Sequence, residues 1–537
     1  MNHNIQLLDC TLRDGAYIVD AEFGTPTIKG VIRKLQKART EIIECGWLKD
    51  TEHKEGTTFF HVPSDLEQYL LERRNDVVYV AMIDWDRYNL DFLPEYDGKS
   101  IDAIRVVFPY GKHKEAIKIG EQIEEKGYKV YFQAANTLAY SDDDLVELAN
   151  DMNKTNAVAL SVVDTFGAMY EEDLERIITV LNKELKKNIK MGFHSHNNQQ
   201  LSFALTMYFV EKLKEFDRGC IVDASLCGMG RGAGNTTTEL ISSYLNRKQD
   251  CNYDLNEIMD AIDLYMQFFQ EKYTWGYSTP YFIAGLYCTH VNNIAYLLSN
   301  HRASAKDMRN IIESMDESDR RKYDYDLLER KYLENQSRHV DDSKDIQLLK
   351  EEFKNRKILL IAPGKSIEEN EEKIKDYIKE NNPIVVEVNA VNRKYKQDYL
   401  FIVNQARYEY ASEIYPELYA YGKKILLSNI KTEPNENEVI LNFDTVVKRG
   451  WVHFDNAMIT CLRLMDKLEV ENLTIAGFDG FKNQYNESYA DEKLPSLNPD
   501  NKWDELNEEI SDMFKDFKNT ATYVKNIEFI TNSIFNI

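Results

Sequence analysis

Four residues in two distant segments have the types and spacing of a metal-binding catalytic site. A short apolar run near the start of the chain ends in Arg13 and Asp14, and a second run far downstream ends in His194 and His196. Residues two apart in a strand point to the same face, so the two histidines converge on one spot. Asp14, at another strand end, would complete a facial set of two histidines and one carboxylate. This constellation predicts a metal-dependent enzyme.

The donor set indicates which metal and which chemistry such a site would support. Neutral imidazoles with a carboxylate suit Mn²⁺, Zn²⁺, Co²⁺ or Fe²⁺; Mg²⁺ is also compatible, and Mn²⁺ is the ion we expect. Its open positions can take a 2-oxo acid and stabilise the enolate formed by carbon–carbon cleavage or condensation. Arg13 is placed to share that enolate charge. A His-x-His pair alone is more often structural, but its combination with Arg13-Asp14 and a glycine-rich stretch favours a site.

Two further segments offer polar groups after strands. Residues 227–239 carry a glycine at every second position from Gly228 to Gly234, which permits close backbone approach, and a following helix would attract anions. Asn235 offers either a carbonyl ligand or a hydrogen bond that orients a ligand. Thr165 offers a hydroxyl to a substrate carboxylate, although its segment also fits a helix N-cap.

Composition excludes several classes of protein. The 537 residues, 43% of them hydrophobic, are too many for one ordinary core. No apolar run reaches the roughly 18 residues of a membrane span. Seven cysteines without regular spacing fit a reducing cytosol. A net charge of −24 repels nucleic acid and anionic membranes. We therefore expect a cytoplasmic protein without signal peptide, membrane span or nucleic-acid partner.

The first 230 residues alternate short β-branched runs with amphipathic helical stretches. Eight strands each followed by a helix is the pattern of a (β/α)₈ TIM barrel, and a doubly wound open sheet is the alternative. We favour the barrel because the chemical residues fall at the carboxyl ends of strands 1, 6, 7 and 8, which would face one mouth. The predicted strands are Gln6–Cys10, Glu41–Cys45, Val77–Ile83, Ala103–Phe108, Lys129–Ala134, Ala157–Val163, Lys190–His194 and Cys220–Leu226.

The remaining chain divides into two further regions. We assign residues 1–280 to the barrel, 281–350 to a helical extension and charged connector, and 351–537 to a Rossmann-like α/β domain without a Gly-x-Gly-x-x-Gly motif. In the last region a helix is predicted over Ser366–Glu380, and strands are predicted at Ile358–Ala362, Ile384–Val388, Tyr399–Val403, Lys424–Leu427 and Leu473–Ala476. Residues 359–366 run from a strand through a glycine turn into a helix, whose amides could cradle a phosphate. This element loosely resembles Rossmann-like domains of bacterial sugar-handling proteins. A nucleotide or nucleotide sugar is therefore a candidate ligand, and a structural or dimerisation role is the alternative.

Three motifs together resemble the metallolyase superfamily on TIM barrels. Thr-Leu-Arg-Asp-Gly at residues 11–15, the His-x-His pair and the glycine-rich stretch occur in this order over roughly residues 5–300. The superfamily includes 4-hydroxy-2-oxovalerate aldolase, 3-hydroxy-3-methylglutaryl-CoA lyase, isopropylmalate synthase and homocitrate synthase. The resemblance implies that the aspartate and both histidines bind a divalent metal, and that Arg13 stabilises a pyruvate enolate.

Within the superfamily the aldolases are the most similar. Residues 164–169 (Asp-Thr-Phe-Gly-Ala-Met) look like the aldolase version, in which a hydroxyl at the Thr165 position contacts pyruvate. Residues 276–278 are similar to a late aldolase segment whose tyrosine, here Tyr277, lies near the active site. These likenesses imply a pyruvate aldolase.

The chain departs from the family pattern at the acid–base group. The aldolases of aromatic degradation carry a catalytic histidine three residues after the metal aspartate, where this chain has Tyr17. The lyase's catalytic cysteine has no match, since Cys227 precedes the glycine-rich loop and Arg231 occupies its middle. The candidates for the acid–base role are Tyr17, Tyr277, His290 and a metal-bound water.

The sequence thus predicts a metal-dependent aldolase that forms or cleaves a 4-hydroxy-2-oxo acid from pyruvate and an aldehyde. We expect a small 2-oxo acid substrate and a homo-oligomer. Two rivals are an acyl-CoA-dependent Claisen synthase or lyase and a non-catalytic metal-binding scaffold. The aldolase-like segment at 164–169 weighs against the first, and the retained ligands with Arg13 weigh against the second.

Overall fold

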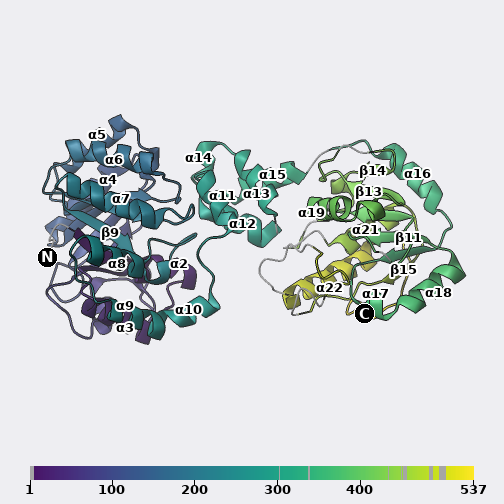
Figure 1. The fold of residues 1–537 in the computed structure, drawn as a ribbon, viewed down its shortest axis with the longest axis horizontal. Helices are drawn as coiled ribbons and strands as arrows, with labels where there is room; N and C mark the ends of the chain where they lie inside the picture. Colours follow the sequence, from purple (N-terminus) through teal and green to yellow (C-terminus); the bar gives the residue numbers. More distant parts are fainter. Residues whose placement is uncertain are drawn as a thin grey trace. The chain divides into compact units, whose positions relative to one another are not determined.

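The computed structural model describes residues 5–536, except residues 302, 337–338, 393, 433–434, 449, 452–455, 483–487 and 495–502. The chain forms two compact units, one of Met1–Val291 with Arg320–Lys322 and the other of Asn292–Asp319 with Tyr323–Ile537 (Figure 1). Each unit has its own parallel sheet.

The sheet of the first unit closes on itself. Strand β1 pairs in parallel with both β9 and β2, so the described strands form a ring. A two-residue strand, β3, adds to β2 outside the ring and leaves the eight strands of a TIM barrel. The barrel prediction is confirmed, and the open sheet is wrong for this unit. The strands are β1 (Ile5–Asp9), β2 (Ile42–Leu48), β3 (Phe59–Phe60), β4 (Val78–Asp84), β5 (Ala103–Phe108), β6 (Lys129–Ala134), β7 (Ala159–Asp164), β8 (Lys190–Ser195) and β9 (Cys220–Ala224).

Helices surround the ring (Figure 1). Helix α3 shows why they pack there, because Ile28, Val31, Ile32 and Leu35 recur at helical spacing and are buried. The expectation of a helix after every strand is wrong at two places, where short 3₁₀ segments over Pro63–Tyr69 and Leu90–Phe92 follow instead. The covering helices are α3 (Thr25–Lys37), α4 (His113–Glu125), α5 (Asp142–Met152), α6 (Glu171–Glu184), α7 (Ser202–Glu215), α8 (Thr238–Lys248) and α9 (Leu255–Ala261).

The interior of the barrel has an apolar layer followed by a polar one. The apolar layer is made by Leu8, Ile42, Val80, Ala103, Tyr131, Ala159 and Ile221. Two residues further along five of these strands, and therefore on the same inward face, the buried side chains are polar: Glu44, Arg105, Gln133, Ser161 and Asp223. Strand alternation thus places a buried polar layer directly beneath the carboxyl-end mouth.

The segment of the sequence that follows the barrel helices and precedes the second sheet is mostly helical. Helix α10 (Gln267–Lys272) and helix α11 (Thr279–Leu286) end the first unit. The helices that follow, in the region predicted as extension and connector, are α12 (Val291–His301), α13 (Ala305–Glu313), α14 (Glu317–Arg320), α15 (Tyr325–Gln336) and α16 (Ser343–Phe353).

The second unit holds an open parallel sheet in the order β14-β13-β12-β11-β10-β15-β16. Strands β14 and β16, at the two edges of the sheet, were not among the predicted elements. The predicted helix from Ser366 to Glu380 breaks at Asn370. The elements are β10 (Ile358–Ile361), α17 (Ser366–Glu369), α18 (Glu371–Asn381), β11 (Ile384–Val388), β12 (Tyr399–Ile402), α19 (Gln405–Glu409), α20 (Pro416–Tyr419), β13 (Lys423–Leu427), β14 (Glu438–Leu441), α21 (Ala457–Lys467), β15 (Asn472–Ala476), α22 (Trp503–Thr520) and β16 (Asn526–Phe529).

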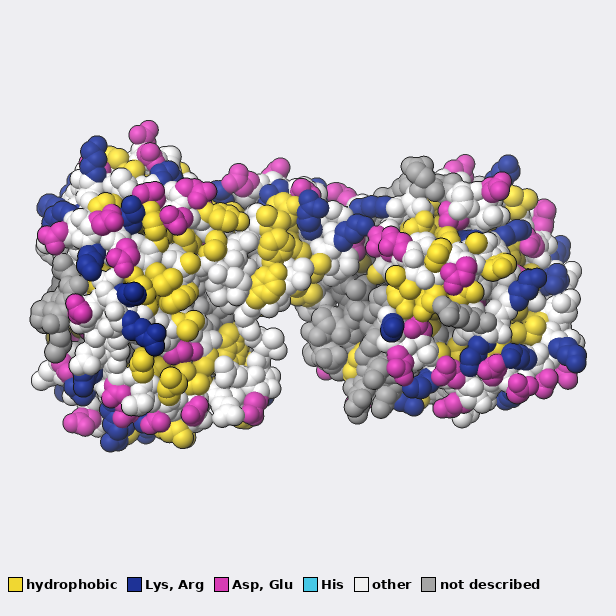
Figure 2. All heavy atoms as spheres, viewed as in Figure 1, with side chains coloured by type: hydrophobic (Ala, Val, Ile, Leu, Met, Phe, Trp, Pro, Cys, Tyr) yellow, Lys and Arg dark blue, Asp and Glu magenta, His cyan; other side chains and the backbone are white. Residues whose placement is uncertain are grey.

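The surface is mixed in charge. On the face that Figure 2 shows, acidic and basic side chains are interspersed on each unit. None of the described helices combines the length and hydropathy that a membrane span requires.

Candidate metal centre

Asp14, His194 and His196 lie together at the mouth of the barrel. Their candidate ligand atoms all lie within 4.8 Å of one another, and all three side chains are buried. His194 belongs to β8 and His196 follows that strand. Asp14 comes from α1 (Thr11–Asp14), a helical turn after β1, and not from the strand end itself.

The charge states of these residues suit a cation. Burial alone would raise the pKa of Asp14, but Arg13, His196 and His194 together hold it well below its usual range. Burial lowers the pKa of His196 to about 4, so its imidazole is neutral near pH 7. Its Nδ1 lies 4.0 Å from Asp14 Oδ2 and has no hydrogen-bond partner among the described residues. A charged carboxylate beside an unpaired imidazole nitrogen is the donor chemistry that a divalent metal needs.

Contacts with neighbouring side chains orient the candidate metal ligands. His194 Nδ1 lies 3.1 Å from Asp223 Oδ2. A hydrogen donated from Nδ1 to this carboxylate leaves Nε2 as the lone pair for a metal. Asn235 Nδ2 donates to Asp14 Oδ2 at 2.6 Å, so of the two predicted roles the contact supports orientation of the aspartate. The Asn235 Oδ1 atom is buried without a partner among the described residues.

A chain of alternating charges runs beneath the three ligands. Glu44 Oε2 lies 2.8 Å from Arg13 Nε and 2.8 Å from Arg105 Nη1. Arg105 Nη2 reaches Asp223 Oδ2 at 2.5 Å, and Asp223 then holds His194. Burial would raise the pKa of Asp223, but Arg105 lowers it. Sequence reasoning missed Glu44, Arg105 and Asp223; the available signal was a charged residue at an inward position of an otherwise apolar strand.

The glycine-rich loop within residues 227–239 lies in close contact with the candidate metal centre. A Cβ on Gly230 would come within 2.3 Å of Asn235 Nδ2 and 2.6 Å of Asp14 Oδ2. Gly234 adopts φ +83°, and a Cβ there would lie 2.0 Å from the carbonyl oxygen of Gly228. Close approach at Gly230 and a left-handed turn at Gly234 therefore explain the predicted need for glycine.

A cavity of about 350 Å³ opens onto the cluster and contains part of the predicted site. Arg13, Tyr17, Thr165 and Arg231 line it together with the three ligands, and Trp47, Met82, Trp85 and Phe108 supply apolar walls. The Thr165 hydroxyl oxygen accepts the amide hydrogen of Asn136 at 2.7 Å, which leaves its own hydrogen for a ligand. Thr165 therefore lines the same cavity as the three ligands, and its contact with a substrate stays a prediction.

Tyr17 stands at the edge of the cavity. Its ring meets Trp47 edge-on at 6.2 Å, and the Arg231 guanidinium lies 5.0 Å from its centre. Desolvation raises the pKa of Tyr17, although about half of its surface is exposed. The phenol is therefore protonated near neutral pH and can donate a proton. Asp84, which the sequence argument did not name, also lines the cavity, and burial raises its pKa.

Tyr277 and His290 lie elsewhere. Tyr277 is largely exposed and lines a different cavity, beside Trp275 and Cys227. His290 contacts Arg231, with 2.7 Å between His290 Nε2 and Arg231 Nη2, and burial lowers its pKa to about 3. Neither is among the residues that line the cavity at the metal ligands.

Comparison with known proteins shows what the barrel is similar to. Residues 111–264 match the HMGL-like family model. The chain is 26% identical over 266 residues to oxaloacetate decarboxylase of Mycobacterium tuberculosis, a match that spans 48% of this chain and 74% of the relative. It is 28% identical over 272 residues to 4-hydroxy-2-oxovalerate aldolase 2 of Salinispora arenicola, spanning 49% and 75%. The carboxyl transferase domain of Rhizobium etli pyruvate carboxylase aligns with a TM-score of 0.48 at 14% identity, covering 65% of each chain.

The fold and the family agree on the class of protein. The first unit is a TIM-barrel enzyme domain, and the named relatives are lyases. The HMGL-like match over residues 111–264 agrees with the resemblance found in the motifs.

Proposed function

We propose that the first unit is a divalent-metal-dependent aldolase that cleaves a 4-hydroxy-2-oxo acid into pyruvate and an aldehyde, or joins them. The observation that carries the proposal is the buried cluster of Asp14, His194 and His196 beside Arg13. Mn²⁺ is the proposed ion. When bound, such an ion would polarise the keto group of the substrate.

Arg13 supplies fixed positive charge to the same place. Its Nε contacts Glu44 and its Nη1 contacts Asp14 at 2.5 Å, so the guanidinium is held rigidly at the cavity wall. Charge that develops on the substrate oxygen during carbon–carbon cleavage is stabilised by a cation that needs no reorientation. Thr165, with a free hydroxyl hydrogen, is placed to bind the substrate carboxylate.

The acid–base work falls to the groups that line this cavity. Tyr17 is held protonated and can deliver a proton, while Asp84 has a pKa raised by burial and can accept one. We assign no proton transfer to Tyr277 or His290, because neither is among the residues that line this cavity.

A second candidate is decarboxylation of a 2-oxo acid such as oxaloacetate. Loss of CO₂ requires no base to begin and ends with protonation of the enolate, which suits Tyr17 as a proton donor. One relative of similar identity bears the name of that activity.

The decisive experiment is exchange of pyruvate methyl protons in D₂O with added Mn²⁺, followed by NMR. We expect exchange by the wild-type protein and none by Asp14→Asn. Metal bound without exchange would contradict an enolising enzyme and favour the scaffold. Release of CO₂ from oxaloacetate, compared with cleavage of a 4-hydroxy-2-oxo acid, then separates decarboxylase from aldolase. Exchange into acetyl-CoA would favour the Claisen alternative. The cytoplasmic location and homo-oligomeric state stay predictions.

A further inference from the structure

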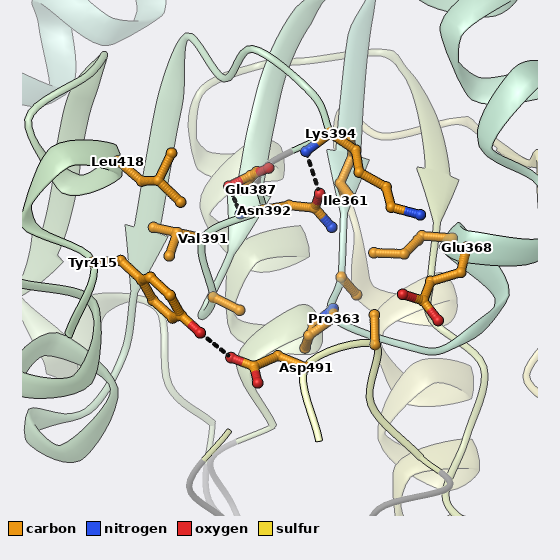
Figure 3. Close-up of a pocket in the computed structure, with 14 residues that line it drawn as sticks. Ile361, Pro363, Glu368, Glu387, Val391, Asn392, Lys394, Tyr415, Leu418 and Asp491 are labelled. Carbon is orange, nitrogen blue, oxygen red and sulfur yellow. Dashed lines mark hydrogen bonds between the residues drawn. The ribbon is translucent and has the colours of Figure 1, made fainter. Parts of the chain in front are cut away.

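The second unit has a cavity at the carboxyl edge of its sheet. The cavity, about 190 Å³ in volume, lies where β10 and β11 end (Figure 3). Strand order runs outward from β10 to β14 on one side and places β15 on the other, so the chain reverses direction between β10 and β15. Ala490 and Asp491, from the segment that follows β15, line the cavity together with the ends of β10 and β11. Ligands of open parallel sheets bind at such reversal points, outside the carboxyl ends of the strands.

A buried carboxyl group lines this cavity without a full set of partners. Glu387, in β11, is 1% exposed. Its Oε2 accepts the amide hydrogen of Asn392 at 2.8 Å, while Oε1 has no hydrogen-bond partner among the described residues. Burial raises the pKa of Glu387 well above its usual range. An unsatisfied buried acceptor is costly unless a ligand completes it.

The glycine turn after β10, which the sequence predicted as a phosphate cradle, is already occupied by a side chain of this chain. The amide of Ser366, which the sequence placed in a phosphate cradle, donates to Asp479 Oδ2 at 2.7 Å, and its hydroxyl also contacts that carboxylate. A Cβ on Gly364 would lie 2.2 Å from the carbonyl oxygen of Gly477, so the glycine serves packing against the loop after β15. The chain's own carboxylate therefore occupies the position that an anion would take.

The charges around the cavity point the same way. Among the lining residues that the structure describes, Glu368, Glu387 and Asp491 carry carboxyl groups and Lys394 carries the one positive charge. That lysine is engaged by Glu371, 2.7 Å from its Nζ. An excess of carboxyl groups repels an anionic ligand and favours one that donates hydrogen bonds.

We propose that this cavity binds the vicinal hydroxyls of an uncharged sugar-containing ligand, with Glu387 as their hydrogen-bond partner. A hydroxyl group both donates and accepts hydrogen bonds, so neighbouring hydroxyls can pair with the carboxyl group of Glu387 whether that group is neutral or ionised. The apolar side chains of Ile361, Val391 and Leu418 line the same space and can cover the ring to which the hydroxyls belong. A nucleoside and a simple glycoside share this chemistry.

Calorimetric titration of the full chain tests the proposal with four probes. They are adenosine, 2′-deoxyadenosine, methyl β-D-ribofuranoside and adenosine monophosphate. We expect adenosine to bind at least about tenfold more tightly than 2′-deoxyadenosine, because a site built around a hydroxyl rejects the analogue that lacks it. Adenosine monophosphate should bind more weakly than adenosine. Binding of the riboside would identify a sugar as sufficient, and its failure beside adenosine would identify a nucleoside; either supports the diol.

Glu387→Met, which keeps the side-chain length but removes both oxygens, should reduce the preference for adenosine over 2′-deoxyadenosine to about one. Glu368→Met, the same change at an exposed position of the rim, should keep the preference. Thermal unfolding checks that both variants fold, and the wild-type comparison of the two nucleosides stands even if Glu387→Met does not. Equal binding of the two nucleosides, no binding of any diol at millimolar concentration, tighter binding of the monophosphate, or an unchanged preference in a folded Glu387→Met would overturn the proposal.

Discussion

Both sheets of this protein bury carboxyl groups near the carboxyl ends of parallel strands, but they treat them differently. In the barrel, Asp14 and Asp223 are each in contact with an arginine, at 2.5 Å in both cases. In the second sheet, Glu387 is equally buried, yet one of its oxygens has no partner among the described residues.

The difference shows that the neighbouring charge, and not burial, decides whether such a carboxyl group is ionised or neutral. Burial acts to raise the pKa in all three cases, but the pKa of Asp14 and Asp223 is lowered while that of Glu387 is raised. A buried ion pair keeps its charges, whereas an isolated buried acid favours the neutral form. The barrel mouth is thus built for ions, and the second cavity is built for hydroxyl groups.

The largest difference between the two sites is expected when a proposed metal ligand of the barrel is removed. Asp14→Asn and His194→Ala should each lower aldol cleavage or pyruvate exchange by about three orders of magnitude or more, since polarisation by a metal is worth several kcal/mol. His194→Ala should lose more metal than Asp14→Asn. Elemental analysis after dialysis against chelator measures the loss.

A matched control is available at another buried histidine of the barrel. His113, which contacts Asp151 at 3.1 Å in a second acidic cluster, should be replaceable by glutamine without loss of metal. Full metal content in both Asp14→Asn and His194→Ala, or its loss in His113→Gln, would show that the ion binds elsewhere.

The next largest effect is expected at Arg13. Lysine keeps the charge but cannot span Glu44 and Asp14 as the planar guanidinium does. Arg13→Lys should reduce turnover by roughly two to three orders of magnitude, the scale of losing one oxyanion donor. Metal content should stay near that of the wild type. Unchanged turnover would remove Arg13 from the chemistry.

A smaller effect on function is expected from replacing a residue that contacts a candidate metal ligand but is not itself a candidate ligand. Asp223→Asn removes the acceptor that orients His194 and the partner of Arg105. We expect metal affinity to fall about 10- to 100-fold and stability to fall by about 3 kcal/mol because a buried arginine loses its counter-charge. Metal titration and chemical unfolding measure the two effects, and normal metal affinity in a folded variant would refute the orienting role.

Asp9 tests, inside the barrel, whether a buried carboxyl group without a charged partner has a raised pKa. It accepts hydrogen bonds from Thr11 and Thr238 but has no described salt bridge. Burial raises its pKa from 3.8 to about 6. The folded state therefore binds this proton more tightly than the unfolded state. Its stabilising contribution, roughly 3 kcal/mol on this scale, is complete below about pH 4 and is lost as the pH rises through 6.

Chemical unfolding between pH 4 and 7 measures that dependence. Asp9→Asn, which cannot ionise, should remove this part of the decline in the free energy of unfolding. A decline of equal size in the variant would mean that other groups cause it.

The sequence predicted much of the barrel because its signals are local. Strands β5 and β6 have the predicted bounds, since a β-branched run between polar turns is visible without any tertiary contact. The His-x-His spacing likewise implies a shared face, and His194 and His196 do lie together in the structure. The edge strands β14 and β16 escaped prediction because neither is apolar throughout, as β10 and β12 are: β14 begins with a glutamate, and β16 alternates polar with apolar residues and is only half-buried.

The sequence by itself thus determined the alternation of strands and helices, the three candidate ligands and the family to which the barrel is related. Only the closed barrel decided that Glu44 meets both Arg13 and Arg105, because contacts across its interior join residues far apart in the chain. Tertiary structure also decided that Asp479 occupies the predicted phosphate cradle, while one oxygen of Glu387 has no hydrogen-bond partner in the part of the chain that the structure describes. A residue's type follows from the sequence, but its charge state and its unused hydrogen bonds depend on which neighbours folding brings within reach.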